Sequence, residues 1–186
     1  MTTDANNIAM RRIVSPVPFR SKVRRAVWSF VQGTAFRFSP HTSTRFRAFL
    51  LRLFGAKVGR HCTIRRTATI YYPWQFVLGD LSSLGDKATI YNLGPVTIGD
   101  RVTISQEAYL CAGTHDYRSP RMPLLTPPIT VGDDAWICAR AFVGPGVNVG
   151  EGAILGACGV AMSGLDPWTI YAGNPATKKK HRVKPQ

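Results

Sequence analysis

Hydrophobic residues recur along most of this chain with a spacing of six. From residue 131 the sequence reads VGDDAW, ICARAF, VGPGVN, VGEGAI and LGACGV, so each unit begins with an aliphatic residue. The residue four positions after each aliphatic residue is small as well, so a second position recurs with the same spacing. In order along the chain, these residues are Ala, Ala, Val, Ala and Gly. A period of six matches neither the 3.6 residues of a helical turn nor the alternation of a simple strand.

The same spacing recurs in earlier parts of the chain, in phase over more than a dozen units. Its aliphatic positions there are Val58, Ile64, Ile70, Leu78, Leu84, Ile90, Val96, Ile98, Ile104 and Leu110. Such a pattern is typical of short strands separated by tight corners, with the aliphatic residue inside and Gly or Asp at the turn. Three units make one triangular coil of 18 residues, as from Val131 to Val149. The repeats therefore predict an all-β fold, a parallel β-helix.

Two segments interrupt the repeats and divide the chain. Residues 1–57 contain no hexads, and the apolar spacing over 23–38 and 44–54 indicates helices within this basic segment. Residues 58–176 form the predicted β-helix domain, from which the loop 116–128, with four prolines, is expected to project. Residues 177–186 form a basic tail.

The charge of the chain is concentrated at its two ends. The net charge is +14, and through Arg66 there are fourteen Lys or Arg residues against the single acid Asp4. Five more basic residues lie between Lys178 and Lys184. Basic ends favour phosphate-bearing ligands, an anionic membrane surface or nucleic acid, and charge alone does not choose among them. No apolar run reaches the roughly 20 residues of a membrane span, and no signal peptide is recognisable, so a cytoplasmic location is expected.

Several segments carry a family resemblance. They are LLRLFGAKVG (50–59), YPW (72–74), ISQEAYLCAGTHDY (104–117), AWICARAFVGPGVNVGEGAILGA (135–157) and AGNPA (172–176). In these the chain resembles the hexapeptide-repeat acyltransferases, and among them the sugar O-acetyltransferases of colanic acid and exopolysaccharide biosynthesis. The resemblance implies a left-handed β-helix, acetyl-CoA as co-substrate, and a homotrimer with each active site between two subunits. It also implies a hydroxyl acceptor on a saccharide or glycolipid intermediate of surface polysaccharide synthesis.

His115 is the predicted catalytic base. Transfer of an acetyl group from a thioester to a hydroxyl needs a base for the hydroxyl proton, and histidine titrates near neutrality. Of the four histidines, His115 alone ends a regular coil and opens the Pro-rich loop. The resemblance places the general base of the sugar acetyltransferases at this junction.

Acceptor-binding residues are predicted around the same junction. Asn92 and Asp86 lie about one coil earlier, where the resemblance places polar groups that bind the acceptor, although both also suit plain corner positions. Asp116 and Tyr117 lie on the loop, with Arg118, and are further candidates for contact with a sugar.

The cofactor-binding residues follow from the resemblance. Trp136 is expected to point out of the narrow coil and to line the pocket for the acetyl and pantetheine arm, or else to lie at a subunit interface. Ala139 and Ala157 match corners that contact pantetheine, and Lys180 matches a basic residue near the adenosine 3′-phosphate. The chain departs from the family over 159–164, where GVAMSG lacks the Thr and Lys that would contact the cofactor.

Other interpretations stay open at this stage. The acceptor could be a non-sugar hydroxyl, as of serine or an antibiotic, or the β-helix could be a non-enzymatic scaffold. A metal-dependent carbonic anhydrase relative needs three histidine ligands, whereas the coils offer only His61 and His115. The four cysteines are isolated, so no metal site is expected, and they are predicted to be buried thiols. No nucleic-acid partner is predicted.

The basic N-terminal segment has two possible roles. Its cations from Arg11 to Arg25, followed by Trp28, Phe30 and Phe38, could form a helix on a membrane surface. The favoured interpretation is that its helices cap the open end of the β-helix, since an exposed coil edge promotes aggregation.

Overall fold

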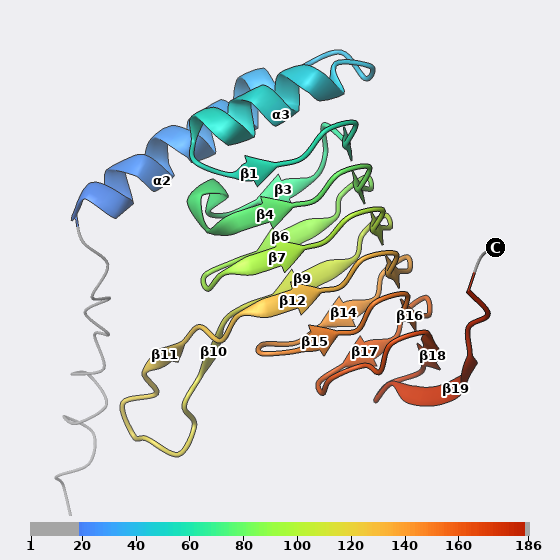
Figure 1. Cartoon of the computed structure of the whole chain (residues 1–186). Helices are drawn as coiled ribbons and strands as arrows, with labels where there is room; N and C mark the ends of the chain where they lie inside the picture. Colours follow the sequence, from blue (N-terminus) through green and yellow to red (C-terminus); the bar gives the residue numbers. More distant parts are fainter. Residues whose placement is uncertain (1–18, 185–186) are drawn as a thin grey trace, which may run out of the picture.

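The computed structural model describes residues 19–184 and shows a three-sided β-helix with two helices across one end (Figure 1). The helices are α2 (Phe19–Val31) and α3 (Thr44–Leu53), and α2 continues into the π-helical segment η1 (Gln32–Phe36). Arg11 and Arg12 lie outside the described residues. Neither helix combines the length and apolar character that crossing a bilayer requires.

The first sheet is parallel throughout. Its strands, in spatial order, are β1 (Lys57–Val58), β4 (Phe76–Leu78), β7 (Val96–Ile98), β12 (Ile129–Val131) and β15 (Asn148–Val149). The third sheet is parallel as well and consists of β3 (Thr69–Ile70), β6 (Thr89–Tyr91), β9 (Tyr109–Cys111), β14 (Phe142–Val143) and β17 (Val160–Ala161). Between them along the chain lies the second sheet, so each coil passes through the three faces in turn.

The second sheet has six parallel strands and one antiparallel edge strand. The parallel strands are β2 (Thr63–Ile64), β5 (Ser83–Leu84), β8 (Thr103–Ile104), β13 (Trp136–Ile137), β16 (Ile154–Leu155) and β18 (Thr169–Ala172). The edge strand is β19 (Thr177–His181), which pairs with β18. The segment expected as a basic tail therefore begins as an ordered strand. The hairpin β10 (Thr114–His115) and β11 (Leu124–Leu125) projects from the coils (Figure 1).

The interior is filled by the aliphatic residues that set the six-residue period. Ile64, Leu84, Ile104 and Ile137 lie above one another inside the second sheet and are fully buried. The second small position is also buried, for example at Ala88, because the interior between three close sheets leaves room only for a short side chain. The parallel β-helix predicted from the hexads is confirmed.

Coil length differs from the uniform 18 residues of the repeat. Val58 pairs with Leu78 and Leu78 with Ile98, so the first two coils advance by 20 residues, whereas Val131 pairs with Val149 and advances by 18. The extra residues lie at the third corner, where the chain passes from the third sheet to the first. In the first coil this corner holds the short 3₁₀ helix η2 (Pro73–Gln75). Pro73 itself is buried.

A ladder of aspartates holds another corner, between the first and second sheets. One carboxylate oxygen of Asp80 accepts a 2.8 Å hydrogen bond from the backbone N–H of Arg60, and Asp100 accepts a 2.7 Å bond from the N–H of Asp80. A carboxylate oxygen of Asp133 continues the ladder and accepts a 2.9 Å hydrogen bond from the backbone N–H of Asp100. A glycine precedes each aspartate because the coils approach closely here: a Cβ at Gly79 would lie 2.4 Å from backbone atoms of Gly99.

Acid should weaken this ladder. The backbone N–H and guanidinium of Arg60 lower the pKa of the Asp80 carboxyl in the folded protein. As pH falls, the unfolded state therefore takes up a proton at this carboxyl before the folded state does. The stabilisation that the ionised carboxyl gives at neutral pH is lost as pH falls to the lowered pKa of the folded state. We expect the urea denaturation midpoint to be constant from about pH 7 to 5 and to fall below about pH 4. Asp80→Asn keeps an acceptor oxygen but does not titrate, so it should reduce this fall; an unchanged pH profile in the variant would contradict the role.

The helices close the first coil with hydrogen bonds on all three sides. The Arg52 guanidinium donates to the carbonyl of Val58 on β1, and the Arg47 Nε donates to the carbonyl of Ile64 on β2 at 2.6 Å. On β3, the Trp28 indole N–H donates to the carbonyl of Ile70 at 2.6 Å. Side chains of α2 and α3 thus satisfy backbone groups that a further coil would otherwise bond.

Trp28 belongs to this cap and not to an exposed membrane-facing surface. Its ring is 1% exposed and packs edge-on against Phe36, which is also buried. Phe30 and Phe38, grouped with Trp28 in the sequence, are exposed. The predicted burial of all four cysteines holds only for Cys62, since Cys111 and Cys138 are half-buried and Cys158 is exposed at a corner.

Candidate active site

His115 lies where the chain leaves the third sheet and enters the projecting hairpin. Residue 115 is the last of β10 and pairs with Leu124 of β11. Its imidazole is exposed, and the Nδ1 atom lies 2.7 Å from the backbone carbonyl of Met122. A carbonyl oxygen only accepts hydrogen bonds, so Nδ1 carries the proton in this contact. In a neutral imidazole with this tautomer, Nε2 carries the lone pair that a general base requires.

The hairpin residues next to His115 stabilise the loop. One Asp116 carboxylate oxygen accepts a 3.0 Å bond from the backbone N–H of Arg118, and the Asp116 N–H donates to the carbonyl of Pro123 at 2.9 Å. Asp116 therefore caps the turn, while the Met122 carbonyl orients His115. Tyr117 is 79% exposed, so its ring is available to a ligand.

Trp136 lies on the outward face of the second sheet, as the sequence predicts. Its ring is 44% exposed, and the indole N–H donates to the Ser105 hydroxyl at 2.8 Å. This bond fixes the ring across two coils, since β13 pairs directly with β8.

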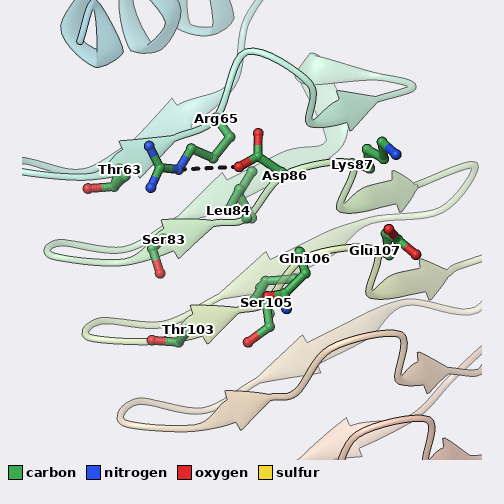
Figure 2. A pocket seen from close by; sticks show the side chains of 12 residues that line it. Thr63, Arg65, Ser83, Leu84, Asp86, Lys87, Thr103, Ser105, Gln106 and Glu107 are labelled. Carbon is green, nitrogen blue, oxygen red and sulfur yellow. Dashed lines mark ion pairs between the residues drawn. The ribbon is translucent and has the colours of Figure 1, made fainter. Parts of the chain in front are cut away.

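Beside Ser105 the surface of the second sheet is hollowed by a pocket of about 600 Å³ (Figure 2). Most of its lining residues have polar side chains, and they come from three coils: Thr63, Arg65, Ser83, Leu84, Gly85, Asp86, Lys87, Thr103, Ile104, Ser105, Gln106 and Glu107. Hydroxyls of successive strands line one side, and charged residues of the second corner, where the chain passes from the second to the third sheet, line the other (Figure 2). Such a surface suits a ligand rich in hydroxyl groups.

The two predicted acceptor residues of the coils have different surroundings. Asp86 lines the pocket, accepts a 2.7 Å bond from the Thr67 hydroxyl and forms a 3.8 Å ion pair with Arg65 (Figure 2). Asn92 is fully buried at the third corner, and its amide bonds both the N–H and the carbonyl of Tyr72, at 2.9 and 2.7 Å. Asn92 thus performs the corner role that the sequence left open, whereas Asp86 is accessible.

The predicted cofactor residues share the second sheet and the second corner. Ala139 follows β13 and Ala157 follows β16, one coil further on, and the N–H of Cys158 bonds the carbonyl of Ala139 at 2.9 Å. Lys180 is exposed on β19 opposite Ile170. Arg182, just beyond β19, donates to the carbonyls of Asp134 and Gly152 and so holds this segment against the coils.

A single chain does not unite these residues. Trp136, Ala139 and Asp86 lie on the second sheet or the second corner, whereas His115 and Asn92 lie at the third corner. In a three-sided prism the third corner is the edge opposite the second sheet. The hairpin β10–β11 lies on the side of the β-helix away from β16 and β18 of the second sheet (Figure 1), so His115 on β10 is separated from Trp136 of its own chain.

Sequence reasoning missed the hydroxyl row of the pocket and the orienting carbonyl of His115. The row had a signal, because Thr63, Ser83 and Thr103 each directly precede an inward aliphatic residue of the second sheet. The contact with the Met122 carbonyl left no signal in the sequence, since every residue has a backbone carbonyl. Within residues 19–184 no group of three or more His, Cys, Asp or Glu side chains is arranged to hold a metal ion.

Comparisons with known proteins agree with this architecture, although no family model matches the sequence. The chain is 41% identical over 171 residues to WcaF of Escherichia coli (strain K12), an acetyltransferase assigned to colanic acid biosynthesis, covering 91% of this chain and 94% of WcaF. It is 25% identical over 143 residues to the galactoside O-acetyltransferase of the same organism, covering 75% of this chain and 70% of that enzyme.

Solved structures show the same fold. A galactoside acetyltransferase in complex with coenzyme A superposes with a TM-score of 0.82 at 22% identity, covering 90% of this chain and 84% of that one. A hexapeptide-repeat acetyltransferase of Vibrio cholerae complexed with acetyl coenzyme A gives a TM-score of 0.81 at 20% identity, covering 90% and 92%.

The chain belongs to the hexapeptide-repeat acetyltransferase family, which confirms the acyltransferase class expected from its sequence. Within that family, its similarity to WcaF extends over nearly the whole length of both proteins. The coenzyme A and acetyl coenzyme A complexes of its structural neighbours agree with the co-substrate that the sequence implied.

Proposed function

We propose that the protein transfers an acetyl group from acetyl-CoA to a hydroxyl of a saccharide or glycolipid intermediate of surface polysaccharide synthesis. The observation that carries this proposal is the contact between His115 Nδ1 and the Met122 carbonyl, which leaves Nε2 as a base on an exposed hairpin. The similarity to WcaF supports the acceptor class.

The proposed reaction is direct transfer. Nε2 of His115 takes the proton of the acceptor hydroxyl as its oxygen attacks the thioester carbonyl carbon. The new C–O bond forms, the C–S bond breaks, and the imidazolium returns the proton to the departing thiolate of coenzyme A. The Met122 carbonyl accepts the hydrogen bond from Nδ1–H both in the neutral imidazole and in the imidazolium. The exchanged proton is therefore always the one on Nε2.

The proposed site lies between two copies of the chain in a homotrimer. His115 of one copy, at its third corner, faces the second sheet of its neighbour, which supplies Trp136 and the pocket. A closed threefold ring repeats this contact three times. The separation of His115 from Trp136 within one chain supports this arrangement, because neither group alone provides both a base and a binding surface.

The neighbouring chain's second sheet has room for both substrates. Trp136, with Ala139 and Ala157 along the corner, would hold the acetyl-pantetheine arm, and Lys180 would meet the adenosine 3′-phosphate. The pocket next to Ser105 would hold the acceptor, where Asp86 and the row of hydroxyls offer hydrogen bonds to sugar hydroxyls. Tyr117 on the incoming hairpin is exposed and would cover it.

The acceptor class is tested by thiol release from acetyl-CoA in the presence of candidate acceptors. Saccharide acceptors with the sugars of surface polysaccharides should raise thiol release above the rate without acceptor, with an acetyl ester in the product by mass spectrometry. Serine and chloramphenicol serve as non-sugar acceptors. Turnover of these two, with none of any saccharide, would overturn the proposed acceptor while leaving acetyl transfer intact.

Complementation between two inactive variants tests the shared site. His115→Ala removes the base and Trp136→Ala removes the opposite wall, so each variant alone should lose activity. In randomly mixed trimers, about one site in four would combine an intact His115 with an intact Trp136 from the next copy. We therefore expect co-expression to restore about a quarter of wild-type turnover. Mixed trimers as inactive as the single variants would place both residues in a site within one chain.

A further inference from the structure

The outer surface of the helical cap carries two exposed apolar rows. On α2 the row is Val23, Val27 and Phe30, and on α3 it is Phe46, Phe49 and Leu53. Phe30 is 71% exposed and Leu53 is 67% exposed, although both belong to well-formed helices. Residues three and four apart share one face of a helix, so each row is a continuous stripe. We call these six residues the cap face.

Both stripes point away from the β-helix. On α2, Trp28 faces the first coil and bonds Ile70. On α3, Arg47 and Leu51 face the coil and are buried. At about 100° of rotation per residue, Phe30 and Phe49 lie on the sides of their helices opposite these buried residues. The packing of the first coil therefore does not use the cap face.

The cap face is surrounded by positive charge. Residues 19–56 contain eight Lys or Arg residues and no Asp or Glu. Lys22, Arg37 and Arg45 are exposed, and no carboxylate pairs with them in the part of the chain that the structure describes. Apolar stripes flanked by cations are the composition of helices that lie in the plane of a membrane interface.

We propose that the cap face binds the surface of a bilayer that contains anionic lipid, with the axis of the β-helix directed away from it. The apolar side chains enter the interface, and the flanking cations contact the lipid phosphates. A second copy of the same face is excluded as the occupant by charge, because two surfaces rich in Lys and Arg repel each other. In the trimer proposed above, three cap faces would lie at one end and bind together.

Vesicle sedimentation tests this proposal with the full chain. The probes are vesicles of phosphatidylcholine alone and vesicles with about one-third phosphatidylglycerol. Each is tested at low salt and at 0.5 M NaCl, where charges are screened beyond a Debye length on the order of 4 Å. The apolar variant is Phe49→Ser with Leu53→Ser, and the charge variant is Lys22→Gln with Arg45→Gln. Met162→Ser is the matched control, since Met162 is 62% exposed and follows β17, the last strand of the third sheet, at the end of the β-helix away from the cap. Far-UV circular dichroism and melting check that each variant is folded.

We expect the wild type to sediment with anionic vesicles at low salt and much less with phosphatidylcholine. The apolar variant should lower the partition coefficient by about tenfold or more. In the charge variant, each lost positive charge should lower it by about fivefold. Met162→Ser should bind as the wild type. Absence of wild-type binding at low salt, or full binding by the folded apolar variant, would overturn the proposal. So would a change of oligomeric state in the apolar variant without vesicles, which would assign the face to a protein contact. Because this binding needs no acceptor, its outcome is independent of acetyl transfer.

Discussion

His115→Ala is expected to lower turnover by about 10² to 10⁴ while leaving the fold unchanged, because a positioned base contributes about that factor. The imidazole is exposed, and within residues 19–184 its one hydrogen bond is to the Met122 carbonyl, so its removal costs the loop little. The measurement is the rate of thiol release from acetyl-CoA at saturating acceptor, with a melting curve for each protein.

The control for His115 is another exposed corner histidine. His61 lies on a corner of the first coil, away from the hairpin, and His61→Ala should retain wild-type turnover. If His115→Ala were to turn over within about twofold of the wild type, a different group would have to accept the hydroxyl proton.

Arg47→Met is expected to lower the free energy of unfolding by about 3–5 kcal/mol. The buried guanidinium donates to the carbonyls of Ile64, Pro40 and His41 at 2.6, 2.8 and 2.8 Å, and to the Ser39 hydroxyl at 2.7 Å. Methionine has a similar length but donates no hydrogen bond, so the Ile64 carbonyl and the part-buried carbonyls of Pro40 and His41 would lose this donor. Because whole domains are stable by only about 5–15 kcal/mol, this is a large share of the total.

Thermal and urea denaturation measure the effect of Arg47. For a chain of this size we expect the Tm to fall by about 6–20 °C, at one protein concentration since assembly adds to stability. Arg45→Met is the matched control, because Arg45 is exposed on the same helix and donates no side-chain hydrogen bond within residues 19–184. It should change stability by less than about 0.5 kcal/mol. Equal melting of the two variants would show that the cap does not depend on Arg47.

The repeats predicted the strands well because the six-residue period reports burial directly. Each inward aliphatic residue between Ile64 and Leu155 is buried, and Trp136 points outward since the interior excludes so large a ring. The two added residues of the early coils escaped prediction. In the second coil Val96 and Ile98 both face inward, and Val96 lies six residues after Ile90, so the spacing of six conceals the longer corner there.

The polar contacts of the cap and site were harder to predict than the strands. Arg47 is an unremarkable cation in the sequence, and only the fold shows that it bonds the edge of β2. Trp28 has the spacing of an amphipathic helix, which does not reveal which face packs on the coil. Asp86 and Asn92 carry similar polar groups at corners, and their different exposure depends on a neighbouring coil.

The third corner has a consequence for how such proteins diversify. The third corner can be measured from the inward aliphatic residue of the third sheet to the inward aliphatic residue of the first sheet that follows it. This interval is eight residues in the first coil (Ile70 to Leu78), 21 in the coil that carries the hairpin (Leu110 to Val131), and six from Val143 to Val149. The second sheet keeps its register through all of these changes. Insertions are therefore tolerated at this edge without displacing the core, so the loops of the third corner can change in length and sequence while the second sheet, on the opposite face, keeps its surface.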